Sequence, residues 1–310
     1  MLRTFTPSRC SHSLANDRLN LYIWGTGHNM TENVRDIEET IVTDLHDKMT
    51  YGGYLGLDRL LSAQQPASDH HDEMLFIIQH QTTELWLKLV LHELDSARSM
   101  LADDDLRGAL KRIARIKHIQ EVMTQQWSVL ATLTPTEYAE FRGSLGNSSG
   151  FQSAQYRAVE FALGNKNRKM LSVFSSEPAN HALLAAELER PTLYDEFLRF
   201  AARRGLPVPP SILTRDVSEP YRFEPDLVPV IRSIYEDSPQ YWDLYEACEE
   251  LVDIEDNFQF WRFRHLRTVS RTIGFKTGTG GSSGVDFLQR ALSLTFFPEL
   301  YAVRTEIGAQ

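Results

Sequence analysis

Cysteine is scarce in this sequence of 310 residues. The two cysteines, Cys10 and Cys248, are far apart and form no C-x-x-C motif or Cys/His cluster. Their arrangement argues against a zinc finger, a thioredoxin-like redox centre and a secreted disulfide scaffold, and favours a reducing cytoplasm. With 42% hydrophobic residues, a chain of this length has enough apolar side chains to fold without metal or disulfide bonds.

Long hydrophobic runs and an excess of positive charge are also missing. No apolar stretch reaches the roughly twenty residues that a membrane-spanning helix needs, because charges interrupt the longest candidates. The formal net charge is −10, whereas binding to nucleic acid depends on clustered Lys and Arg. We therefore expect a soluble, cytoplasmic protein with no membrane and no nucleic acid as partner.

Sustained two-residue alternation is absent, whereas apolar residues recur every three or four positions along most of the chain. This pattern predicts an all-α fold, a large helical bundle with few or no strands. Three long helices are expected at about residues 69–100, 105–130 and 238–271. Shorter helices are expected after Pro135 and at 151–163, 183–189 and 193–204, and a Pro-rich loop at 206–225.

The N-terminal part differs in composition. The first 29 residues are rich in Ser, Arg and Asn, and a charged, helix-like run follows from Thr31 to Lys48. The leader is interpreted as disordered or as a start-site artefact; a transit peptide is the alternative, because acidic residues are scarce before Asp17. We assign residues 1–48 to a partly disordered leader with a short helix, and residues 49–310 to a single domain.

Common metal motifs are absent. No histidine has a glutamate three positions before it, which argues against a di-iron carboxylate bundle, and no H-E-x-x-H zinc-protease helix occurs. His70-His71-Asp72-Glu73 is interpreted as a charged helix start, because adjacent helical side chains point in different directions. C-x-x-C-H is missing too, so any haem would be held non-covalently.

Two histidines lie in aromatic surroundings. Phe76, His80 and Glu84 are four residues apart, which places them along one face of a helix. His265 lies within Phe260–Arg267, among aromatic rings and arginines. A lone helical histidine is more often a hydrogen-bonded core residue, but this context offers what a haem requires: a flat apolar surface, an imidazole for iron and cations for the propionates.

A third helix carries a candidate carboxylate anchor. Thr134-Pro135-Thr136-Glu137 is a strong helix start, and it places Tyr138 and Arg142 one turn apart on the same face. An arbitrary arginine is most often a surface charge. Here Tyr138 and Phe141 flank it, and a guanidinium suits a carboxylate ligand.

The glycine-rich segment Gly274–Gly284 follows the last long helix. It lacks the order G-x-x-x-x-G-K-[ST] and does not follow a predicted strand, which argues against a phosphate loop. Two interpretations stay open. The glycines form a flexible surface linker, or they let the backbone close over a small ligand with the Thr279 hydroxyl directed to it.

Taken together, these motifs resemble the tryptophan 2,3-dioxygenase family. The resemblance runs from about Tyr51 to the C-terminus. The motifs that carry it stand in the expected order: Leu61–Pro66, Phe76–His80, Tyr138–Arg142, Gly150–Ser153, Leu163–Asn167, Phe263–His265, Gly278–Gly284 and Thr295–Leu300.

The resemblance implies an all-α haem enzyme, a homotetramer built as a dimer of dimers, with one haem b per subunit that is ferrous when active. It implies the insertion of O2 across the indole C2–C3 bond of L-tryptophan to give N-formyl-L-kynurenine, the first step of tryptophan catabolism through the kynurenine pathway. His265 is similar to the axial iron ligand, and His80 to the catalytic distal histidine that meets the indole N–H. The substrate-binding residues it implies are Phe76, Ile77, Ile78, Gln79, His80, Tyr138, Arg142, Ser149 and Thr279, with Tyr51, Tyr54 and Leu55 reaching into a neighbouring subunit.

Other functions stay open from the residues alone. A haem-binding sensor or carrier would use the same iron ligand without needing Arg142 and Thr279. A helical interaction scaffold would use the aromatic residues only as core. An indole dioxygenase of relaxed specificity is the nearest alternative among enzymes.

Overall fold

The structure is a computed structural model that describes residues 34, 35 and 37–308. The chain divides into two units between Leu61 and Ser62, and each is described by itself. The first 33 residues, which include Cys10, lie outside the described residues. The interpretation of the leader is therefore not tested by the structure. The assignment of residues 49–310 to a single domain stays a prediction.

The described part of the first unit contains two short helices, α2 (Tyr51–Leu55) and α3 (Leu57–Leu60). The Thr50 side chain caps α2 by accepting a hydrogen bond from the Gly53 amide, and Gly56 separates the two helices in the left-handed conformation with φ 62°. The helix-like run expected at Thr31–Lys48 is wrong for the described residues of that stretch, which form turns and bends. Their apolar side chains are exposed, so no packing stabilises a helix there.

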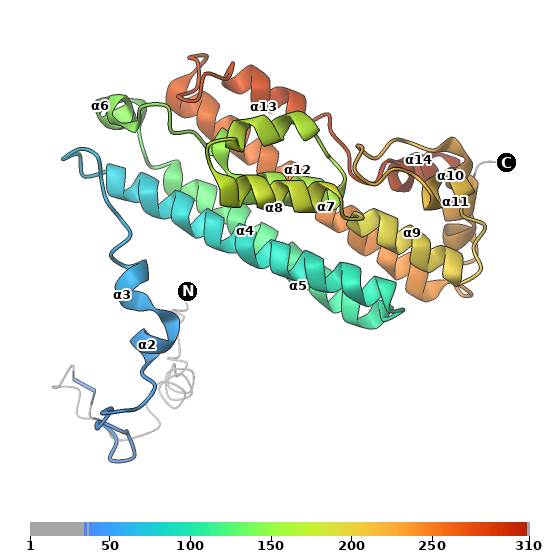
Figure 1. Ribbon diagram of the computed structural model, residues 1–310, viewed down its shortest axis with the longest axis horizontal. Helices are drawn as coiled ribbons and strands as arrows, with labels where there is room; N and C mark the ends of the chain where they lie inside the picture. The colour runs from blue at the N-terminus through green and yellow to red at the C-terminus, as the bar shows by residue number, and fades with distance from the viewer. Residues whose placement is uncertain (1–33, 36, 309–310) are drawn as a thin grey trace, which may run out of the picture. The chain divides into compact units, whose positions relative to one another are not determined.

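The second unit is all-α, and no strand occurs among its described residues, which confirms the predicted fold class. Its frame is three long helices: α4 (Glu73–Ala102), α5 (Leu106–Leu130) and α12 (Trp242–Ile273). Figure 1 shows α4 and α5 lying side by side. They run antiparallel, since Thr82 bonds Gln126 at one end and Arg115 bonds Glu93 toward the other.

Helix α12 runs parallel to α5. Lys117 of α5 pairs with Glu250 and Asp253 of α12, and ten residues later Trp127 contacts Trp261. This register brings the C-terminal half of α12 beside the C-terminal end of α5. The N-terminal half of α4 reaches the same end of the unit.

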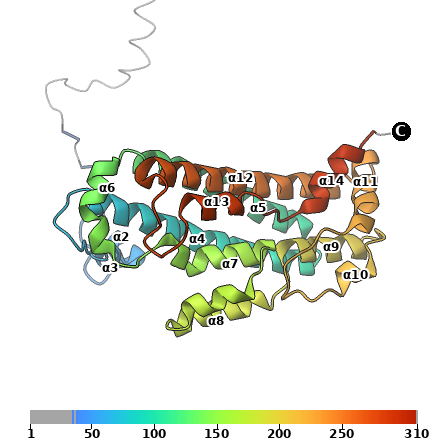
Figure 2. The ribbon, with the colours of Figure 1, turned by 90° about the horizontal axis from the view of Figure 1, so that it is seen from above.

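Shorter helices complete the unit: α6 (Pro135–Arg142), α7 (Ala154–Leu163), α8 (Pro178–Leu188), α9 (Leu193–Arg203), α10 (Pro210–Leu213), α11 (Val228–Glu236), α13 (Val285–Ala291) and α14 (Pro298–Glu306). Figure 2 shows α6 at one end of the long helices and α10, α11 and α14 toward the other. None of the described helices is long and apolar enough to cross a bilayer.

The predicted helix boundaries differ from the observed ones at several places, and α8 begins at Pro178 instead of residue 183. Helix α4 begins at Glu73 because the Glu73 carboxylate accepts hydrogen bonds from the amides of Ala67 and Ser68, which holds the preceding residues as a loop. Helix α12 begins at Trp242, after a turn. The Pro-rich loop contains the four-residue helix α10, which starts at Pro210.

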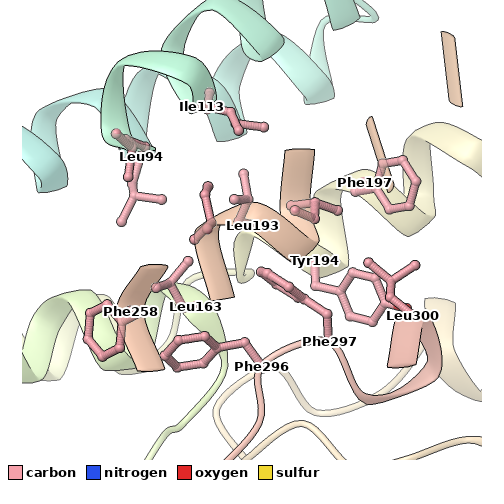
Figure 3. Packing of buried hydrophobic residues seen from close by; sticks show 14 of the residues in the cluster. Leu94, Ile113, Leu163, Leu193, Tyr194, Phe197, Phe258, Phe296, Phe297 and Leu300 are labelled. Carbon is pink, nitrogen blue, oxygen red and sulfur yellow. The ribbon is translucent and has the colours of Figure 1, made fainter. Parts of the chain in front are cut away.

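The main core lies between the long helices and the C-terminal segment. Figure 3 shows Leu94 and Ile113 from α4 and α5 pointing toward Leu193 of α9, with Phe296 and Phe297 on the opposite side. Phe296 and Phe297 are fully buried. Burying such aromatic side chains contributes roughly 1.5–3 kcal/mol each, and their contacts with Phe258 and Tyr194 hold the C-terminal segment against α12 and α9.

Candidate functional site

His265 lies on α12 among aromatic rings. Its imidazole stacks on the Trp127 indole, with centroids 4.8 Å apart and an interplanar angle of 9°, and it contacts Trp261 at 5.4 Å. Burial, together with the charges of the neighbouring His80 and Arg157, lowers the pKa of His265 to about 4. The imidazole is therefore neutral near pH 7 and has a lone pair available for a metal.

His80 lies on α4 and is held in one tautomer. Its Nδ1 is 2.7 Å from the Phe76 carbonyl oxygen, and a carbonyl only accepts hydrogen bonds, so Nδ1 carries the proton. Burial lowers the pKa of His80, which keeps the ring neutral. Nε2 is therefore unprotonated and available to accept a hydrogen bond. The Phe76 ring packs on His80 with centroids 4.2 Å apart.

Helix α6 brings Tyr138 and Arg142 to the same place. The predicted capping box is present: the Thr134 side chain accepts from the Glu137 amide, and Glu137 accepts from the Thr134 amide. Tyr138 contacts Phe76 at 5.8 Å, which joins α6 to the His80 face of α4. Burial raises the pKa of Tyr138 although Arg142 lies beside it, so the phenol is neutral.

Arg142 connects α6 to the glycine-rich segment. Its Nη2 donates to the Thr277 carbonyl at 2.5 Å, and its Nε is buried with no hydrogen-bond partner among the described residues. An unpartnered buried N–H is costly, so this guanidinium still has capacity to bind an acceptor.

The glycine-rich segment packs against the loop after α6. The Thr279 hydroxyl donates to the Ser148 carbonyl. A Cβ on Gly280 would lie 2.7 Å from the Ser149 Cβ, closer than any real contact, so only glycine permits this approach. The segment thus lies beside Ser149 and Arg142, which favours the ligand-closing interpretation over a free surface linker.

The residues around His265 suit a haem. The imidazole is neutral and partly exposed, so another group has access to it. Trp127 Nε1 and Arg157 Nε are buried without partners among the described residues, and both belong to side chains that contact or electrostatically influence His265. A group that brings both a metal for the imidazole and a carboxylate for the Arg157 guanidinium fits these side chains.

Not every predicted substrate residue shares the His80 face of α4. Ile78 is 44% exposed and lies two residues from His80, on the opposite side of the helix. Gln79 is buried, and Ile77 is partly buried. Tyr51, Tyr54 and Leu55 lie on α2 in the first unit, where all three side chains are exposed. Their substrate roles stay predictions.

Trp127 and Arg157 are the residues that sequence reasoning missed. Trp127 lies near the end of α5, 138 positions before His265, and nothing in its local sequence distinguishes it from a core aromatic. Arg157 lies on α7 and pairs with Glu160. The contact of Trp127 with His265 follows from the parallel register of α5 and α12, which the local sequence does not specify.

Comparison with known proteins decides the family. The family profile described as "Tryptophan 2,3-dioxygenase" matches residues 37–206 and 226–307. The chain belongs to the tryptophan 2,3-dioxygenase family. The match begins before Tyr51, so the family resemblance extends further toward the N-terminus than the sequence motifs indicated.

Individual members of the family are similar over nearly their whole length. A tryptophan 2,3-dioxygenase of Kineococcus radiotolerans is 68% identical over 280 residues, which are 90% of this chain and 98% of that protein. One of Arthrobacter sp. is 67% identical over 279 residues, 89% of this chain and 98% of that protein. One of Serratia proteamaculans is 58% identical over 279 residues, 89% of this chain and 100% of that protein. The predicted membership in the tryptophan 2,3-dioxygenase family is confirmed.

Proposed function

We propose that this protein inserts O2 across the indole C2–C3 bond of L-tryptophan to give N-formyl-L-kynurenine, the first step of tryptophan catabolism through the kynurenine pathway. Family membership over about nine-tenths of the chain supports the reaction. The observation that carries it is local: a neutral His80 with an unprotonated Nε2 lies on α4 next to Phe76, and Phe76 also contacts Tyr138 of the helix that carries Arg142.

His265 is the proposed axial ligand of haem b, with one haem in each subunit. When bound, a ferrous haem would supply the iron chemistry that activates O2. The protein's part is to present a neutral imidazole and to keep water away from it. The buried position of Trp127 and Trp261 beside His265 supports both roles.

Two side chains are proposed to orient the substrate, His80 at its indole ring and Arg142 at its α-carboxylate. His80 Nε2 accepts the indole N–H, which fixes the ring, and Phe76 packs on the indole. Arg142 binds the α-carboxylate through its guanidinium, and the Thr279 hydroxyl and Ser149 complete the amino-acid end. Because the indole is electron-rich, holding its C2–C3 bond in a reactive position is the main requirement.

Ile77, Ile78 and Gln79 are proposed to contribute to the substrate pocket, as family resemblance implies. Tyr51, Tyr54 and Leu55 are proposed to complete the pocket of a neighbouring subunit in a homotetramer, a cytoplasmic dimer of dimers. Their exposed apolar surface on α2 supports a contact with another chain. Light scattering of the purified protein tests this: a mass of one chain would contradict the assembly.

The deciding experiment loads the protein with haem, reduces it without oxygen, then adds L-tryptophan and air. We expect N-formylkynurenine absorbance at a rate that depends on protein concentration. His265→Ala is expected to lose haem retention or activity, because no other described residue is assigned to the iron. Haem binding without product would support a sensor or carrier. Equal turnover of tryptamine and D-tryptophan would support a dioxygenase of relaxed specificity.

A further inference from the structure

The ring of His265 has no hydrogen bond to any described residue. A histidine that binds a metal usually donates its second ring N–H to a carboxylate or a carbonyl, and this bond fixes the orientation of the ring. His80 shows such a restraint, since its Nδ1 donates to the Phe76 carbonyl at 2.7 Å. Something other than a described hydrogen-bond acceptor must therefore orient His265.

The Trp127 indole is placed to do so. Its plane is nearly parallel to the imidazole, at 9°, with centroids 4.8 Å apart. Rotation of the imidazole about its Cβ–Cγ bond would drive one ring edge into the indole, so a parallel stack at this distance restricts the ring to one plane. The Trp127 side chain is itself only 6% exposed.

A second aromatic ring fixes the indole. Trp261, one turn before His265 on α12, lies 5.5 Å from Trp127 and 5.4 Å from His265 between ring centroids. The two tryptophans come from different helices, so the stack also depends on the packing of α5 against α12. The imidazole plane is thereby coupled to the register of these helices.

We propose that Trp127 is the positioning residue of His265: its indole face sets the plane of the axial imidazole by stacking. The proposal rests on the proposed ligation of haem by His265. Groups that fix the orientation of a metal-binding imidazole tune the metal that it would hold. The same stack holds the ligand ready before haem enters.

Two substitutions separate the indole face from the indole N–H. Trp127→Phe keeps an aromatic face and removes the buried, unpartnered N–H. Trp127→Met removes the aromatic face and retains much of the volume. The matched control is Trp242→Met, because Trp242 of α12 also stacks on a ring, Tyr245, with centroids 5.5 Å apart and an angle of 19°, and is largely exposed.

The readouts are the iron–histidine stretching band of the ferrous protein by resonance Raman, the rhombicity of the ferric electron paramagnetic resonance signal, and kcat and KM separately. For Trp127→Met we expect a shifted and broadened iron–histidine band and a kcat lower by about 10- to 100-fold, with KM for tryptophan changed less than about 3-fold. Trp127→Phe and Trp242→Met should stay close to the unsubstituted protein.

An unchanged iron–histidine band and rhombicity in Trp127→Met would overturn the proposal. A band displaced equally in Trp127→Phe would also overturn it, because the N–H and not the stack would then be responsible. Should Trp127→Met fail to fold, Trp127→Leu carries the same test. If the unsubstituted protein showed no iron–histidine band at all, the ligation by His265 would be wrong, which is a different outcome from an unshifted band in the variant.

Discussion

Arg142 and His80 each have a hydrogen-bonding group that no described residue satisfies, and this group is available to the substrate. Arg142 donates one N–H to Thr277 and has its Nε buried without a partner among the described residues. His80 has its proton fixed on Nδ1. Both residues are therefore prepared to bind complementary groups, a carboxylate in one case and an N–H in the other.

Removal of the guanidinium should weaken tryptophan capture. We expect Arg142→Ala to lower kcat/KM by an amount equivalent to about 2–4 kcal/mol, the scale of truncating one partner of a desolvated charge pair, while haem content stays unchanged. Steady-state kinetics and the Soret absorption measure the two effects. Arg204→Ala is the control, since Arg204 pairs with Asp243 on the surface, and it should change neither. An unchanged kcat/KM in Arg142→Ala would refute the role.

His80→Ala should lower efficiency without abolishing the reaction, because Phe76 and Arg142 share the positioning. The expected loss in kcat/KM is about 1–3 kcal/mol, the scale of one buried hydrogen bond. Tryptophan methylated at the indole nitrogen provides the check. With the unsubstituted protein, the methylated substrate should have a much lower kcat/KM than tryptophan. With His80→Ala, the two substrates should have similar kcat/KM values, because the hydrogen bond that the methyl group blocks is already absent. Complete loss of product in the variant would instead indicate an obligatory proton transfer.

At the scale of elements, α6 is the carrier of Tyr138 and Arg142. This helix has only eight residues, so its capping box accounts for much of its local stability. Its start could be predicted because Thr134-Pro135-Thr136-Glu137 interact within one turn. Where it lies relative to α4 could not, because that depends on contacts such as Phe76 with Tyr138.

Removing the capping side chain of α6 should weaken substrate binding. We expect Thr134→Ala to destabilise the helix start by about 1 kcal/mol and to raise KM for tryptophan several-fold, because Tyr138 and Arg142 lose their fixed base. The control is Thr192→Ala, since Thr192 forms the same kind of capping box with Asp195 on α9. That variant should lower the melting temperature and leave KM unchanged. Equal KM values in the two variants would show that α6 is held by its tertiary contacts alone.

At the scale of the whole molecule, the C-terminal segment closes the core. Glu299 of α14 is fully buried, and its carboxylate accepts a hydrogen bond from the Glu224 amide at 2.6 Å. Burial raises the pKa of Glu299 to about 7 from an ordinary value of 4.5. The folded protein therefore retains this proton over a pH range in which the unfolded chain has released it.

This proton links stability to pH. The contribution of Glu299 is fully present below about pH 4.5 and is lost as the pH rises through about 7, since charging the buried carboxylate is unfavourable. Glu299→Gln keeps an acceptor and cannot ionise. We expect it to be more stable than the unsubstituted protein above pH 7, by about 3 kcal/mol at most, and to show no advantage near pH 4.5. Urea unfolding across this range measures the difference, and an advantage that does not depend on pH would contradict the assignment.

The sequence by itself determined the fold class, the three long helices and the family. Helical periodicity, capping residues and the order of several irregular motifs are local properties, so they can be read without knowing where the chain turns. The candidate residues His80, Arg142, Thr279 and His265 were also evident from these motifs.

Only the tertiary structure decided how those residues act. The free Nε2 of His80 follows from one backbone contact, and the stacking of Trp127 on His265 follows from the parallel register of α5 and α12. The low pKa of His265 and the high pKa of Glu299 both come from burial. Burial and contact between distant residues depend on the packing of the whole unit, and no local pattern of residues specifies them.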